Sequence, residues 1–190
     1  YKAKLRKEAL KEEVNSTVSK LRKATDTREA LALFREHSRE ELQSDLDFTA
    51  EVFGKAVNGF MNENLRELRK VLTAVEEKKI HLKQVKRVGT LGVTQLDHDI
   101  AVEKGLYYYQ GNDFASEIIF SIRRLAEPLK DHIDNNFSPL SPVQKDDFGK
   151  VSEQIISFLR NCATMIRKND YIGFEELIAE SITLMNRTYR

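Results

Sequence analysis

The chain has 190 residues, and its 31 Lys and Arg against 30 Asp and Glu leave a formal net charge of +1. This balance argues against a nucleic-acid-binding protein held by bulk positive charge, and a single Cys excludes a disulfide within the chain and a Cys-based metal framework. With only 8 Gly and 3 Pro, the chain has too few turn residues for an all-β sandwich or barrel, so we expect an all-α antiparallel bundle of long helices.

The first part of the chain shows helical periodicity. Apolar side chains between Leu5 and Leu21 recur every three to five positions, as one face of a helix requires. Asp26, with Glu29 three positions later, is typical of a helix N-terminus and predicts a second helix that reaches about Leu42.

A further helix start is offered by Ser44 and Asp47, and an apolar stripe then continues over residues 52–82. The clearest break comes next, because Gly89 and Gly92 fall within four residues and glycines commonly end helices. We therefore expect two helical units within one continuous compact domain, over residues 1–88 and 93–190.

The second part predicts one long helix from about Gln95 to Asn135. The loop over residues 135–142 carries two of the three prolines, and Ser141 or Pro142 opens the next helix. A tight turn at residues 169–170 precedes a last helix. The side chains expected to face inward from the long helix are Leu96, Ile100, Leu106, Phe114, Ile118, Ile122, Leu125, Leu129 and Ile133.

Three carboxylates near the end of this long helix form a candidate metal site. Glu127, Asp131 and Asp134 stand at positions i, i+4 and i+7, so they share one helix face, and His132 lies beside them. Such carboxylates hold a cation in a bundle when other helices add ligands, whereas Arg123 and Arg124, one turn away, favour a solvated ion-paired face. Both interpretations stay open at this point.

The remaining features favour structure over catalysis. No dinucleotide-binding, P-loop, zinc-protease or serine-hydrolase motif occurs, so we expect no enzyme. Cys162 lies on an apolar helix face, where packing is the simpler role. His37 and His81 have no ligand-like spacing and are expected at the surface. Residues 107–109 are three consecutive tyrosines, of which at least one ring should lie at a helix–helix or subunit seam.

Basic residues are concentrated at the start of the chain. Because Tyr1 is not preceded by Met, we expect a piece of a longer protein, and cations directly after a membrane span are typical of the cytoplasmic side. The residues expected to face a membrane or a partner are Lys2, Lys4, Arg6 and Lys7. A second basic cluster, residues 78–87, precedes the two glycines, and acids near both clusters argue against nucleic acid as the partner.

Two segments resemble a known family. The run Ser121–Ser141, SIRRLAEPLKDHIDNNFSPLS, resembles a signature of the PhoU-like cytoplasmic domain of bacterial inorganic phosphate transporters of the PiT class, above all of the versions fused to the transporter. Residues 165–177, MIRKNDYIGFEEL, are similar to a helix–turn–helix of that family. The resemblance covers roughly residues 95–188.

The resemblance implies an all-helical PhoU-like fold of two three-helix units, or a variant of it, that regulates phosphate uptake at the cytoplasmic face of the membrane. Its partner would be the transmembrane transporter part, in the same chain or in a separate subunit. Homo-oligomers are a further expectation, and the alternatives are a free-standing PhoU-like signalling adaptor and a helical-bundle metal-binding protein.

Members of the wider family bind divalent or iron-type metals through a Glu/Asp-x-x-x-Asp motif. Here Arg123 stands where the first carboxylate belongs, and Glu127-x-x-x-Asp131 restores the spacing one turn later, in another register. Glu41-x-x-x-Asp45 is a weak second copy in the first half. This departure from the pattern puts the implied metal in doubt.

Overall fold

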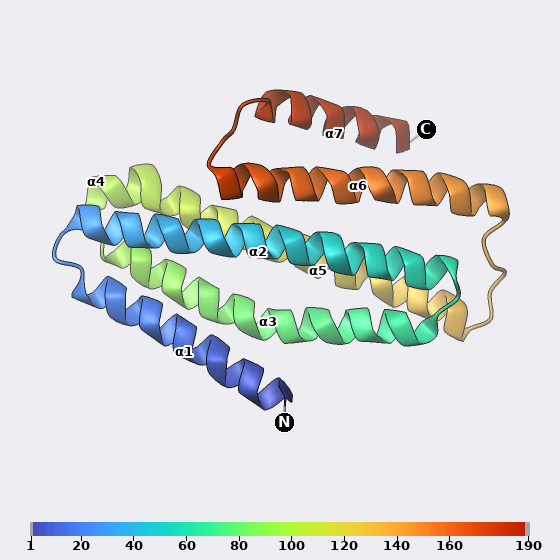
Figure 1. The fold of residues 1–190 in the computed structure, drawn as a ribbon, viewed down its shortest axis with the longest axis horizontal. Helices are drawn as coiled ribbons and strands as arrows, with labels where there is room; N and C mark the ends of the chain where they lie inside the picture. The colour runs from blue at the N-terminus through green and yellow to red at the C-terminus, as the bar shows by residue number, and fades with distance from the viewer. Residues whose placement is uncertain (1, 189–190) are drawn as a thin grey trace. The chain divides into compact units, whose positions relative to one another are not determined.

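The computed structural model describes the backbone of residues 2–188 and the side chains of residues 8, 12 and 14–186. The described chain is an all-α bundle of long helices (Figure 1). Its helices are α1 Lys2–Lys23, α2 Thr27–Met61, α3 Leu65–Thr94, α4 His98–Ile100, the π-helical segment η1 Ala101–Gly105, α5 Leu106–Asp134, α6 Pro142–Lys168 and α7 Phe174–Thr188. No helix in the described part is long and apolar enough to cross a bilayer.

The structure divides the chain into two compact units. Unit 1 comprises residues 1–42 and 77–117, and unit 2 comprises residues 43–76 and 118–190, so α2, α3 and α5 each contribute to both. This division differs from the one expected from the sequence, whose boundary at residues 88–93 falls inside α3. The physical reason is that contacts between antiparallel helices group residues that lie far apart in the sequence.

The core of unit 1 forms where α1, α2, α3 and the 95–97 turn meet. Leu21, Ala30, Phe34, Val88 and Leu96 form one buried cluster there, and Phe34 and Leu21 are fully buried. Tyr108 from α5 closes this cluster with an edge-to-face contact on Phe34, at 5.8 Å between ring centroids. As expected, one tyrosine of the triplet thus lies at a helix–helix seam, while Tyr107 is 71% exposed.

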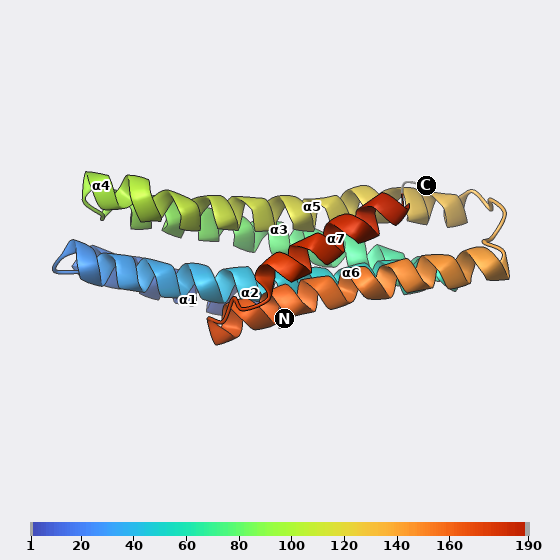
Figure 2. The same cartoon turned by 90° about the horizontal axis from the view of Figure 1, so that it is seen from above.

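The core of unit 2 forms between α2, α3, α5 and α6. Val57 of α2 and Leu68 and Val71 of α3 are buried, as are Ile119 of α5 and Leu159 of α6. α7 follows α6 and crosses from it towards α5 (Figure 2). Only Leu177 among the large apolar side chains of α7 is buried, so this helix is held by a narrow seam.

Local sequence explains where α2 and α6 begin. Glu29 N donates to Asp26 Oδ1 at 2.8 Å, which confirms the predicted N-cap of α2, while the Glu29 carboxylate accepts from Thr25 N at 2.7 Å. Ser141 and Gln144 form a complete capping box at the start of α6, with Pro142 in the first helical turn.

Three helices end in the same way, with one residue in the left-handed conformation. Glu63, Asn136 and Asn169 have φ values of 52°, 53° and 50°. In each case the residue's own N–H bonds three residues back and the next N–H bonds five residues back, as Asn64 N to Gly59 O at 2.7 Å shows for α2. This is the Schellman pattern, which satisfies carbonyls that the helix end leaves free.

Glu63 is the unfavourable member of this set, because a side chain with a Cβ is strained at positive φ whereas Asn tolerates it. We expect Glu63→Gly to raise the free energy of unfolding by about 0.5–1 kcal/mol. Glu51→Gly, the same change in the interior of α2, should instead lower it by about 1 kcal/mol. Urea denaturation of both variants tests this, and equal signs would contradict the backbone argument.

Four sequence-based expectations about the helices are wrong. α2 passes Ser44 and Asp47 without a break, since hydrogen bonding of the helix continues through both. α3 likewise continues through Gly89 and Gly92 and ends at Thr94. A Cβ at Gly92 would lie 2.5 Å from Phe34 Cδ2, so the helix needs glycine there for close packing and not for termination.

The other two incorrect expectations concern which side chains are buried. The buried positions of α5 are Asn112, Ala115, Ile119, Ile122 and Ala126, whereas Phe114 and Ile118 are 67% and 40% exposed. Small residues line the inner face because neighbouring helices approach closely. His37 and His81, expected at the surface, are 9% and 8% exposed.

Candidate functional site

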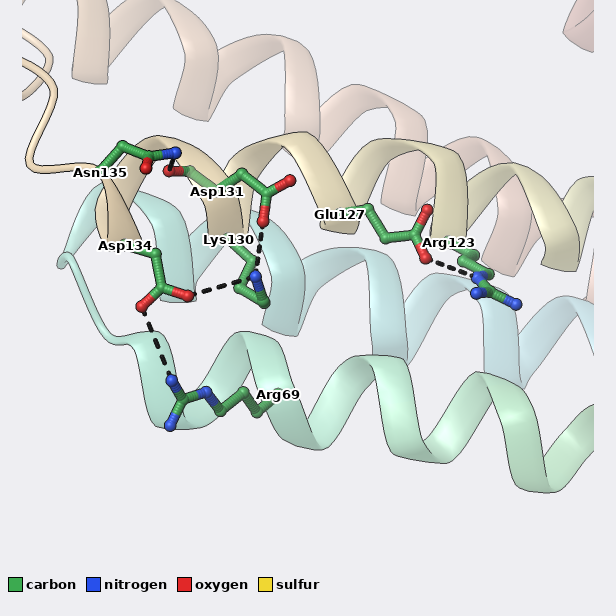
Figure 3. A network of polar contacts seen from close by, with 7 residues as sticks. All are labelled: Arg69, Arg123, Glu127, Lys130, Asp131, Asp134 and Asn135. Carbon is green, nitrogen blue, oxygen red and sulfur yellow. Dashed lines mark hydrogen bonds and ion pairs between the residues drawn. The ribbon is translucent and has the colours of Figure 1, made fainter.

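The three predicted carboxylates lie at the C-terminal end of α5, in unit 2. Glu127, Asp131 and Asp134 follow one side of the helix, and their side chains are 47%, 61% and 39% exposed (Figure 3). The helical spacing in the sequence therefore does bring the three groups onto one face.

Each carboxylate has a cation as its neighbour. Arg123 Nε donates to Glu127 Oε1 at 2.7 Å, and the same guanidinium bonds Glu76 of α3. Lys130 Nζ lies 2.5 Å from Asp131 Oδ1 and 3.2 Å from Asp134 Oδ2 (Figure 3).

The two cations are held in their charged form by these contacts. The hydrogen bond to Glu127 raises the pKa of Arg123, with further contributions from the charges of Glu127 and Glu76. The hydrogen bond to Asp131 raises the pKa of Lys130, followed by the bond to Asp134. Arg69 of α3 adds a longer ion pair to Asp134 at 3.6 Å. The arrangement is a network of alternating charges on a solvated surface.

Such a network fits ion pairing better than metal binding. Within the described residues, no group of three His, Cys, Asp or Glu side chains is close enough to hold a metal ion. His132 does not join the carboxylates, because its Nε2 lies 3.0 Å from the carbonyl oxygen of Ser138. A metal at Glu127 and Asp131 would have to displace Arg123 and Lys130.

We therefore expect purified protein, exposed to Zn²⁺, Mg²⁺ or Fe²⁺ and then dialysed, to carry no stoichiometric metal. Elemental analysis of the natural chain beside the Glu127→Ala, Asp131→Ala variant measures this. Stoichiometric metal in the natural chain that is lost in the variant would contradict the ion-pair interpretation and would support the family's metal motif.

The segment that carries the family resemblance forms the cap of α5. Asn136 is the left-handed residue, Phe137 N bonds His132 O at 3.1 Å, and the rings of His132 and Phe137 pack edge to face at 5.4 Å. The apolar contact between these two positions is a regular part of a Schellman cap. The His-Ile-Asp-Asn-Asn pattern thus has a structural explanation in helix termination.

A cavity of about 320 Å³ lies beside this cap. Phe60 of α2 contacts the His132 ring at 5.3 Å, and Glu63 and Lys145 add charged groups to the lining. The loop over residues 135–141 closes one side. The cavity shows that the signature segment also shapes a recess, which no spacing in the sequence indicated.

The basic N-terminal residues are placed only in part. The backbone of Lys2, Lys4, Arg6 and Lys7 belongs to α1, but their side chains lie outside the described residues. The contact they were expected to make stays a prediction.

A buried, hydrogen-bonded Glu–His pair in unit 1 was missed by the sequence interpretation. His81 Nε2 of α3 lies 2.7 Å from Glu41 Oε2 of α2, and the two side chains are 9% and 11% exposed. Burial alone raises the pKa of Glu41, but the hydrogen bond from His81 and the charges of His81, His37 and Lys78 bring the pKa below its ordinary value of 4.5. Nearby, Asn112 Nδ2 of α5 approaches Ser38 Oγ at 3.4 Å, also in the interior.

One signal in the sequence could have found this pair. Glu41 and His37 lie one helical turn apart on the face of α2 that also carries Phe34, which is buried. A polar residue on the apolar face of a helix calls for a partner on a facing helix, because buried charges are paired.

Cys162 is partly buried, in agreement with a packing role. Burial raises the pKa of its thiol, which disfavours the thiolate that a nucleophile needs.

Comparison with known proteins finds no family model, no curated protein and no solved structure that matches this chain.

Proposed function

We propose that this chain is a regulatory interaction domain of an inorganic phosphate transporter, and that it modulates phosphate uptake by contact with the membrane part at its cytoplasmic face. The observation that carries the proposal is the segment Ser121–Ser141, which resembles the PhoU-like signature. In unit 2 this segment is one continuous local structure, comprising the last turns of α5, its cap and the capping box of α6.

The architecture supports an interaction role. Long antiparallel helices present extended faces to a partner. The surface at the end of α5 carries alternating positive and negative charges, with which a partner of complementary charge can form ion pairs. A domain of this kind regulates only if it contacts two states of the transporter differently, because a partner that binds both equally shifts nothing.

The first test is the coding sequence upstream of Tyr1. Encoded transmembrane helices there would support a domain fused to its transporter. Their absence would favour the alternative, a free-standing PhoU-like adaptor, whose test is co-purification with a separate transporter or sensor kinase.

The functional test is phosphate uptake. In cells that lack other phosphate transporters, uptake of radioactive phosphate by the parent protein is compared with uptake by a version without residues 1–190, at equal membrane abundance. The proposal expects a changed rate or a changed response to external phosphate. Identical uptake curves would contradict a regulatory role.

The predicted contact surface has a matched control within α1. Changing Lys2, Lys4, Arg6 and Lys7 to Glu should weaken regulation if these cations face the partner or anionic lipid. Changing Lys20 and Lys23 to Glu, at the other end of the same helix, should leave it intact. Equal effects of both variants would argue against a contact at the N-terminal end.

A further inference from the structure

A second, half-open cavity lies in unit 2, on the side of α5 that is opposite its charged face. It has a volume of about 510 Å³ and is lined by side chains of four helices, α2, α5, α6 and α7. Its lining includes Phe53 of α2, Ile122 and Leu125 of α5, and Phe158 of α6. Leu184 and Met185 contribute from α7, which crosses from α6 towards α5 (Figure 2).

Among the residues whose side chains the structure describes, the lining carries no charged group. Its polar groups are hydroxyls, and two of them are already used, since Thr49 Oγ1 donates to Asp45 O at 2.7 Å and Ser181 Oγ donates to Ile178 O at 2.7 Å. A charged occupant would therefore lose its hydration without a counter-charge, which costs several kcal/mol. The uncharged lining therefore favours a neutral, apolar occupant.

The size of the cavity distinguishes a small molecule from a partner helix. A helix about 10 Å across with a 5.4 Å pitch fills roughly 400 Å³ per turn, so the cavity has room for little more than one turn. Binding sites for small molecules, by contrast, commonly measure about 300–1,000 Å³ and are mainly apolar.

α7 is suited to admit such a ligand. Leu177 is buried and Leu184 is half-buried, whereas Ile178, Ile182 and Met185 are 39%, 48% and 53% exposed. Helices with few buried contacts open at low cost in free energy. Met185 lines the cavity and is exposed, so it lies at an opening.

From these observations we infer that unit 2 binds one neutral hydrocarbon ligand, an alkyl chain or a compact aromatic ring system, in the cavity between α2, α5, α6 and α7. Bound ligand adds apolar contacts between α7 and the other three helices and so stabilises the folded chain. The inference does not depend on the proposed transport role, because it concerns only the packing of helices within unit 2.

The test uses the neutral fluorescent probe N-phenyl-1-naphthylamine with the 190-residue chain. We expect saturable fluorescence enhancement with one site per chain and displacement of the probe by 1-dodecanol. Phosphatidylcholine vesicles form a separate arm. Co-sedimentation with vesicles, without one-to-one probe binding, would instead mean that the apolar residues contact a lipid surface, and the inference would be wrong.

Substitutions locate the site. Ser121→Phe fills the cavity and should weaken probe binding at least tenfold. Ser138→Phe makes the same change in the exposed loop after α5, which does not line this cavity, so it should leave binding unchanged. Met185→Glu places a charge at the opening and should also weaken probe binding. It provides a second test if circular dichroism shows that Ser121→Phe does not fold.

Three results would overturn the inference. The first is that the natural chain shows no saturable probe binding. The second is that folded Ser121→Phe or folded Met185→Glu binds the probe as tightly as the natural chain does. The third is that the probe binds only when light scattering shows a doubling of mass. The last result would make a second copy of the chain the occupant.

Discussion

Gly92→Ala is expected to lower the free energy of unfolding by about 1–3 kcal/mol, although alanine is the better helix former. Gly92 lies inside α3, and a Cβ there would meet three ring atoms of Phe34 at 2.5–2.9 Å. Phe34 is fully buried in the core of unit 1, so its ring has little room to move. The steric cost therefore exceeds the gain of about 1 kcal/mol in helix propensity.

Gly149→Ala is the matched control, with the opposite sign. Gly149 lies inside α6, and no atom lies within 4 Å of the position that its Cβ would take. Only the helix propensity remains, so this variant should be more stable by about 0.5–1 kcal/mol. Urea denaturation of both variants under the same conditions measures the two signs.

A double-mutant cycle with Phe34→Leu isolates the steric contact. Leu is smaller than Phe, so Gly92→Ala should cost about 1 kcal/mol less in the Phe34→Leu background than in the natural chain. If Gly92→Ala stabilises the protein, or costs the same in both backgrounds, the close approach of α2 and α3 is not the reason for this glycine.

His81→Leu is the second substitution with a large expected effect, a loss of about 3–5 kcal/mol, because it leaves the Glu41 carboxylate buried without its nearest partner. Changing Glu41 and His81 together to Leu should recover most of that loss, since a buried ion pair can be replaced by apolar side chains of similar volume at little cost. His98→Leu is the control, because the His98 side chain is 91% exposed, and it should change stability by less than about 0.5 kcal/mol.

The pH dependence of stability provides a separate measurement of the same pair. In the natural chain the pKa of Glu41 is lowered on folding, chiefly because the bond and charge of His81, with the charges of His37 and Lys78, outweigh burial. Its contribution is therefore complete above the unfolded value of about 4.5 and is lost as the pH falls through the lower folded pKa.

In His81→Leu the burial of Glu41 remains while its main partner is gone, so the folded pKa should rise. A group with a raised pKa favours the folded state as it becomes protonated, and the cost of His81→Leu should therefore shrink between pH 7 and pH 4. Denaturation midpoints of both proteins over this range test the sign. A cost that is constant with pH would mean that Glu41 does not carry its charge in the folded protein.

Helix boundaries that depend on local chemistry were predictable from the sequence. Asp26 and Ser141 cap helices because their side chains accept from backbone N–H groups three residues later, and such bonds need no tertiary contact. The turn at Asn169 is local for the same reason, since Asn tolerates the left-handed conformation that ends α6.

The candidate site was predictable in the sequence spacing of its carboxylates and in the local ion pair between Arg123 and Glu127. Glu127, Asp131 and Asp134 share a face because a helix repeats every 3.6 residues, but the contact of Arg69 from α3 with Asp134 depends on which helices pack together. The buried Glu41–His81 pair shows the same limit, because its members lie forty residues apart and neither has a telling local motif.

The sequence by itself determined an all-α bundle, its capped helix starts and its polar turns, because composition, periodicity and capping act within a few residues. The tertiary structure alone decided what the glycines of α3 do, which side of α5 faces inward and that His37 and His81 are buried. These outcomes depend on the distance between helix axes, and that distance is set by small residues such as Gly92 and Ala115 only once a facing helix is in place.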